Sequence, residues 1–185
     1  VGAQMTTQTI VESGLTFGPY PEGRCFYIEK SNIYAHIQQG VQMAEFLLLR
    51  TGNGKPPVVW VVEAKSSTPR PETQPNFDAF ITGIREKLVN AFSLGWASCL
   101  KRHQRSDAEL PEPFKTLDLS QAGVRFVLVI NGHQEAWLPP IQEALKKALH
   151  ATVKTWSFSP TSVAVINDEI ARQYGLILPE NGVDV

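Results

Sequence analysis

The sequence predicts an α/β sandwich around a central mixed sheet, and three observations support this fold class. Residues 58–65 and 124–130 are runs rich in β-branched and aromatic side chains, which are typical of buried strands. Between them, residues 76–103 carry apolar side chains at helical spacing. The Gly- and Asn-rich turn at 51–56 joins the first of these runs to a strand expected at 41–50, which predicts a hairpin.

The N-terminal part of the chain shows weaker signals. Residues 1–10 are polar and Thr-rich, which predicts a loose end or an edge strand. Residues 11–24 hold three glycines and two prolines, which indicate turns. After Phe26 we expect a short helix with Ser31 as its N-cap, ending at Gly40.

Two loops and four elements complete the prediction. Three prolines indicate a loop at 66–75, and the polar residues 104–123 indicate a surface excursion that orders on a partner. The remaining elements are a helix from about Leu138 to 150, an edge strand at 153–158, a strand at 162–166 and a helix at 168–174 that ends at Gly175. No shift in composition marks a second domain, so residues 1–185 are expected to form one.

Composition limits the class of protein. Among 185 residues, 43% are hydrophobic and 19% charged, as in soluble globular proteins, and no apolar run approaches the ~20 residues of a membrane span. No secretory signal is visible, and Cys25 and Cys99 lack metal-ligand spacing, so we expect a cytoplasmic protein. The net charge of −1 argues against coating nucleic acid by bulk charge, but allows a local basic patch around an acidic site.

Three charged residues stand out in the predicted hairpin. Glu63 and Lys65 alternate onto one face at the end of a buried strand, where desolvating them without partners is costly. Glu45 is a carboxylate in an otherwise apolar strand, and a hairpin brings it to the same end as Glu63. The structural alternative is a surface ion pair at the strand end, worth ~0–1 kcal/mol.

These residue types suit a divalent cation and a phosphate. Mg²⁺, or Mn²⁺, prefers hard oxygen ligands, which Glu45, Glu63 and the carbonyl of Ala64 would supply. Lys65 would hold a phosphate as a point charge, or orient or deprotonate an attacking water. Glu29 would reach the metal through water, the alternative being a solvated carboxylate at a helix start.

Other polar residues near this stretch are expected to play structural roles. We expect these residues to cap loops or helices, to lie on a solvated helix face, or to make favourable contacts with a helix dipole. The alternative is that they contact a phosphate or the DNA backbone. They are Ser66, Ser67, Gln74, Asp78, Arg85, Lys87, Lys101, Arg102, His103 and Arg105.

An acidic residue on one strand, Glu-x-Lys on the next and a long helix after it resemble the PD-(D/E)XK nuclease superfamily, which has the restriction-endonuclease-like α/β/α fold. The resemblance covers about residues 26–131, with 132–178 as added elements. It implies that Glu45 takes the place of the motif's acidic residue, while Glu63 and Lys65 take those of its Asp/Glu and Lys.

The resemblance has two further implications for residues. Glu29 sits where many members carry an additional helix glutamate. The first motif is usually Pro-Asp, whereas this chain has Ala44-Glu45, so the metal geometry would differ.

The function implied is a Mg²⁺-dependent endonuclease that cleaves DNA in preference to RNA, with a homodimer as one arrangement. A second reading is a nuclease-like domain that no longer cuts and acts as a nucleic-acid-binding or assembly subunit. A third is an interaction domain unrelated to nucleic acid that docks through residues 104–123.

Overall fold

A mixed sheet forms the centre of this computed structural model, which describes residues 9–104 and 106–178. The first three strands of the sheet pair antiparallel, and the last two run parallel to the third. This confirms the mixed α/β class. In spatial order the sheet strands of the described chain are β3 (Cys25–Phe26), β4 (Phe46–Gly52), β5 (Lys55–Lys65), β6 (Gly123–Ile130) and β7 (Val163–Asn167).

The predicted hairpin is β4 and β5, in a register that pairs Phe46 with Val62. Strand β4 is shorter than the sequence indicated, since residues 41–45 precede it. The Glu45 N–H donates to the Val62 carbonyl at 3.0 Å, and the Glu45 carbonyl accepts from the Glu29 N–H at 3.3 Å. Glu45 therefore lies where β4 begins and the chain leaves the sheet.

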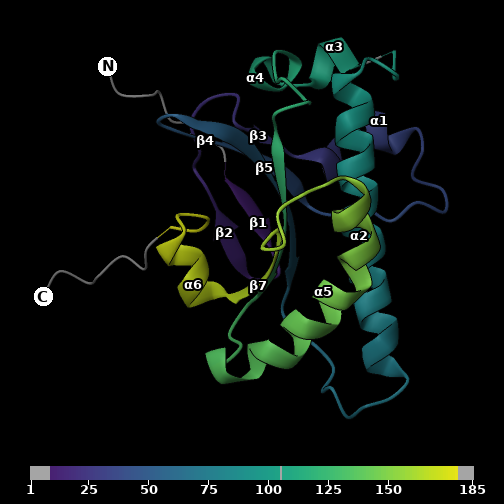
Figure 1. Cartoon of the computed structure of the whole chain (residues 1–185), viewed down its shortest axis with the longest axis vertical. Helices are drawn as coiled ribbons and strands as arrows, with labels where there is room; N and C mark the ends of the chain where they lie inside the picture. The colour runs from purple at the N-terminus through teal and green to yellow at the C-terminus, as the bar shows by residue number, and fades with distance from the viewer. Residues whose placement is uncertain (1–8, 105, 179–185) are drawn as a thin grey trace, which may run out of the picture.

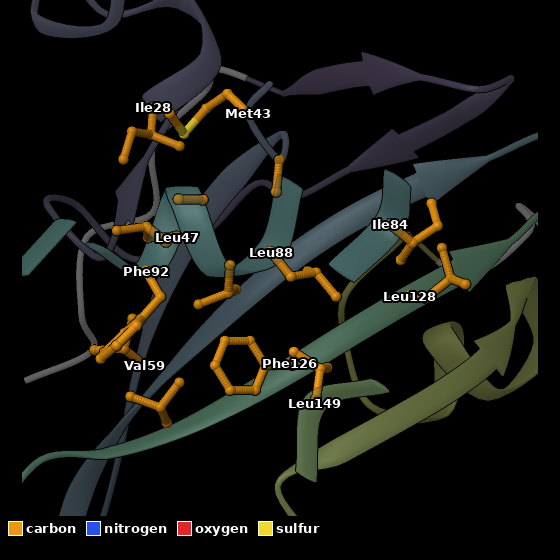
Figure 2. Close-up of a cluster of buried hydrophobic side chains, with 14 of the residues drawn as sticks. Ile28, Met43, Leu47, Val59, Ile84, Leu88, Phe92, Phe126, Leu128 and Leu149 are labelled. Carbon is orange, nitrogen blue, oxygen red and sulfur yellow. The ribbon is translucent and has the colours of Figure 1, made fainter. Parts of the chain in front are cut away.

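Helices α2 (Asn76–Cys99) and α5 (Leu138–Thr155) cover one face of the sheet (Figure 1). Figure 2 shows Leu88 and Phe92 of α2 directed at side chains of the sheet such as Phe126. Each large side chain buried here contributes about 1.5–3 kcal/mol of transfer free energy.

Gly95 explains how closely α2 approaches the sheet. A Cβ atom at this position would lie 2.5 Å from Cδ1 of Leu47, a buried residue of β4. At Gly83, in the same helix, a Cβ atom would meet nothing within 4 Å. The glycine that weakens the helix at 95 is therefore required by packing.

The opposite face is covered by a hairpin that the sequence did not reveal and by a helix (Figure 1). Strands β1 (Ile10–Glu12) and β2 (Leu15–Phe17) pair antiparallel, and α6 (Asp168–Gln173) lies on the same side. Phe17 of β2 packs edge-on against Phe46, with ring centroids 5.2 Å apart. Residues 1–8, part of the predicted loose end, lie outside the described chain.

The short helix after β3 is confirmed in kind but not in length. A 3-10 helix, η1 (Ile28–Lys30), precedes α1 (Asn32–Ala35). The Ser31 hydroxyl accepts from the Tyr34 N–H at 3.1 Å, as expected of an N-cap.

The surface excursion predicted at 104–123 is wrong for the described residues. Helices α3 (Ser106–Glu109) and α4 (Glu112–Lys115) lie there, and Phe114 is only 1% exposed. Its ring lies 6.4 Å from that of Phe26 in β3. Phe114 therefore packs this segment against the core, a contact that the proline-rich sequence does not indicate.

The edge strand predicted at 153–158 is also wrong. Helix α5 follows the short 3-10 helix η2 (Glu135–Trp137), begins at Leu138 as expected, and runs through Thr155. Phe158 turns back so that its ring lies 5.5 Å from that of Phe92. None of the helices in the described chain is long and apolar enough to cross a bilayer.

Candidate active site

Glu45 and Glu63 lie at the adjoining ends of β4 and β5. Glu63 is the third residue from the end of β5, and its side chain is fully buried. Glu45 directly precedes β4 and is 5% exposed. The bond from the Glu45 N–H to the carbonyl of Val62 fixes the two backbones side by side. The structure thus places Glu45 beside Glu63 on the neighbouring strand, and the charge of Glu63 acts on the Glu45 carboxyl.

Two lysines hold one oxygen of the Glu63 carboxylate. Oε1 accepts from the ammonium of Lys65, two residues on, and from that of Lys87 at 2.9 Å. Oε2 is buried and has no hydrogen-bond partner among the described residues. The two ammonium groups therefore orient the Glu63 carboxylate, with one oxygen left to accept a further positive group.

Lys87 is a functional candidate that sequence reasoning assigned wrongly to a solvated helix face. It projects from α2 and is half-buried. Burial lowers the pKa of Lys87, but the Glu63 carboxylate outweighs this effect, and the net pKa is raised above its ordinary value. The pairing depends on how α2 packs on β5, which spacing along the helix does not reveal.

Glu45 is the unusual acid of this site. Burial, followed by the charges of Glu63, Glu29 and Glu12, raises its pKa to about 8. Its Oε2 is buried without a hydrogen-bond partner in the described chain. At neutral pH this carboxyl therefore holds a proton in the absence of another cation.

Glu29 and Glu12 extend the acidic group. Carboxylate oxygens of Glu12, Glu29 and Glu45 lie within 4.8 Å of one another. Glu29 belongs to η1 and also contacts Lys30 at 3.2 Å. Glu12 comes from β1 and accepts a hydrogen bond from the Tyr27 hydroxyl. No pattern in the sequence indicates Glu12, because only the unpredicted β1–β2 hairpin brings it here.

The backbone at Ala64 is oriented toward the same region. The Lys65 carbonyl accepts from the Asn131 N–H at 2.8 Å, on the β6 side of the strand. The Val62 carbonyl faces the other way, toward Glu45. Carbonyls alternate along a strand, so that of Ala64 shares the direction of Val62 and faces the chain just before β4.

Several weaker candidates lie away from these carboxylates or in structural contacts. Arg85 Nε donates to the Ala148 carbonyl at 3.1 Å and joins α2 to α5. Gln74 donates to Asp78 Oδ1 at 3.1 Å, while the N-cap of α2 is Pro75. Lys101 lies 3.6 Å from Asp107 in an exposed pair. These contacts agree with structural roles, although neither Gln74 nor Asp78 caps the helix.

The chain matches no protein-family model, no curated protein and no solved structure. What the site can do follows from its own chemistry. Two buried carboxylates at adjoining strand ends each retain an unpartnered oxygen, and leaving such atoms desolvated costs free energy. Carboxylate oxygens in this number are what Mg²⁺ and Mn²⁺ accept from proteins, so the residues present fit a divalent cation.

Proposed function

We propose that the protein is a divalent-metal-dependent nuclease that hydrolyses phosphodiester bonds, in DNA in preference to RNA. The observation that carries the proposal is the pair of buried carboxylates, Glu45 and Glu63, each with a free Oε2 at adjoining strand ends. A restriction-endonuclease-like form of the α/β fold is part of the same proposal.

The order of elements around the pair supports the resemblance to the PD-(D/E)XK superfamily. Glu45 stands at the start of β4, and Glu63 and Lys65 end its antiparallel neighbour β5. The long helix α2 comes next, and then β6, which pairs parallel to β5. This is the order of elements that the resemblance implies.

Glu45 and Glu63 would hold Mg²⁺ or Mn²⁺ through their free oxygens, with the Ala64 carbonyl as a further oxygen. When bound, the ion supplies charge neutralisation for the phosphate and acidifies a water molecule. Lys87 keeps Oε1 of Glu63 occupied, which leaves Oε2 as the oxygen available for the metal. Its role is to position Glu63.

Lys65 is the group best placed to act on substrate. Its side chain is 30% exposed while that of its partner Glu63 is fully buried, so the ammonium lies at the edge of the site. There it would attract the scissile phosphate as a point charge and hold the attacking water. Glu29, which is partly exposed near Glu45, would hold a second water.

A fluorogenic DNA substrate with Mg²⁺ or Mn²⁺ tests the proposal. We expect cleavage by the wild type and a loss of about 100-fold or more in Glu63→Gln and Lys65→Ala, because both changes remove charges at the reacting phosphate. Glu86→Gln and Lys146→Ala, at exposed helix positions, are matched controls that should cleave normally. Equal cleavage by wild type and site variants contradicts the proposal.

A non-cleaving nuclease-like subunit is the second candidate. Glu45 in place of the usual Asp favours it, as does the neutralisation of Glu63 by two lysines. Retained DNA binding without any Mn²⁺ binding in calorimetry would support this candidate over the nuclease. The docking segment at 104–123 loses its support, because Leu110 and Phe114 of that segment are buried in the core.

A further inference from the structure

A second charged cluster lies on the face of the sheet opposite to Glu63. The Arg50 guanidinium of β4 lies 4.4 Å from the ring centroid of Trp60 in β5, and that of Arg125 in β6 lies 4.8 Å from it. Trp60 is 7% exposed and contacts Tyr174 edge-on. Arg50 ends the apolar run of β4, and Arg125 interrupts that of β6.

Neither arginine has an acidic partner among residues 9–104 and 106–178. No carboxylate of the described chain forms an ion pair with Arg50 or Arg125, and the Nε–H of each is buried without a hydrogen-bond acceptor. Burial, and then the charge of Arg125, lower the pKa of Arg50 against an opposing effect of Tyr20. The Trp60 ring attracts both guanidinium groups, but it cannot accept a pair of N–H hydrogen bonds from either of them. The paired N–H donors of the two arginines therefore remain available to a ligand.

These side chains line a cavity of about 550 Å³. Lys55 adds a third positive group, and the hydroxyls of Ser159 and Thr161 lie on its wall, 2.9 Å from each other. Pro56 and Val58 supply apolar surface, and none of the residues that line this cavity is acidic. The volume lies in the range of small-molecule sites, about 300–1,000 Å³.

The cavity is separate from the carboxylate site. Trp60 and Glu63 are three residues apart in β5, which places their side chains on opposite faces of the sheet. Glu63 contacts Lys87 on the α2 side, whereas Trp60 contacts Tyr174 just after α6. A ligand in one site therefore does not contact the groups of the other.

We propose that this cavity binds the phosphate group of a small molecule of about nucleotide size. Two guanidinium forks present paired N–H donors that match phosphate oxygens, and Trp60 holds both forks in place. Three positive groups suit a phosphate dianion better than a single carboxylate. The apolar wall at Pro56 and Val58 accepts the body of the ligand. The inference does not depend on nuclease activity.

Calorimetry in metal-free buffer at fixed ionic strength tests this site, with AMP and inorganic phosphate as probes. We expect the wild type to bind both, AMP more tightly, and the Kd for AMP to rise at least tenfold in Arg50→Gln and Arg125→Gln. Arg125→Lys keeps the charge without the fork and should give an intermediate loss. Arg102→Gln, at an exposed position after α2, is the matched control and should bind as the wild type does.

A second measurement separates binding from folding. For each variant it compares the shift in Tm on adding phosphate with the shift on adding chloride at equal ionic strength. We expect the shift in the wild type and in Arg102→Gln, and its loss in the two cavity variants even where their basal Tm is unchanged. An unchanged Kd in both cavity variants would overturn the proposal. So would variants that weaken binding of a single-stranded oligonucleotide but not of AMP, because the cavity would then contact a nucleic-acid backbone.

Discussion

At the scale of single residues, Glu63 and Glu45 are buried acids in opposite circumstances. Glu63 is compensated by two ammonium groups, whereas Glu45 is surrounded by other carboxylates. Removing the charge of the first breaks an ion-pair group, and removing that of the second relieves repulsion. The two glutamates should therefore respond in opposite directions to the same substitution.

We predict that Glu63→Gln lowers the free energy of unfolding of the metal-free protein by about 1–3 kcal/mol, because two partly buried lysines lose their partner. Glu45→Gln should raise it at pH 8, where the Glu45 carboxyl is losing its proton. Urea unfolding of both variants beside Glu86→Gln measures the changes. Stabilisation by Glu63→Gln would show that the lysines do not depend on this carboxylate.

The pKa of Glu45 predicts a pH dependence with a definite sign. In the folded protein this pKa is raised from 4.5 to about 8, so between these values the folded state binds more protons than the unfolded state. The free energy of unfolding of the metal-free protein should therefore fall as pH rises from about 5 to 8. One group contributes a slope of at most about 1.4 kcal/mol per pH unit.

Urea unfolding across this pH range compares the wild type with Glu45→Gln. We expect the variant to lack this part of the decline, since its side chain does not titrate. Parallel curves for the two proteins would mean that Glu45 is ionised throughout the range.

At the scale of elements, helix α2 carries its own internal control in two glycines. We predict that Gly95→Ala lowers the free energy of unfolding by about 1–2 kcal/mol, because the added methyl group meets Leu47 and overpacking outweighs the gain in helix propensity. Gly83→Ala should raise it by about 0.5–1 kcal/mol, since the same gain meets open space.

Thermal or urea unfolding of the two alanine variants measures this difference. Equal stabilisation by both substitutions would mean that α2 is free to move away from β4 at Gly95.

Elements with strong periodicity or turn chemistry could be predicted from the sequence. The hairpin of β4 and β5 follows from its Gly-rich turn, and β6 from the apolar run at 126–130. The β1–β2 hairpin was missed because its strands have only three residues each, on either side of the turn at Gly14. Helix α4 was missed because burial of Phe114, a tertiary contact, stabilises an element too short to show a period.

At the scale of the whole molecule, the carboxylates and two of the arginines gather at different places on the sheet. The carboxylates lie at the adjoining ends of β4 and β5, while Arg50 and Arg125 flank Trp60 on the face opposite to Glu63. Although the net charge is only −1, the charged side chains are therefore distributed very unevenly over the molecule. Net charge alone gives no account of which ligands the protein attracts.

The candidate site was partly predictable from local patterns in the sequence. Alternation along β5 placed Glu63 and Lys65 on one face, and the hairpin placed Glu45 beside them. Lys87 and Glu12 join the site only through the packing of α2 and of the β1–β2 hairpin on the sheet. No local pattern in the sequence encodes those contacts.

The measurement that tests the central claim most directly is a calorimetric Mn²⁺ titration of the wild type, Glu45→Gln, Glu63→Gln and the control Glu86→Gln at pH 7. We predict that the wild type and the control bind Mn²⁺ with release of a proton, seen as a heat that depends on the buffer. Affinity should fall at least about tenfold in each site variant. The same affinity in all four proteins, or no binding by the wild type, would contradict a metal site at these two carboxylates.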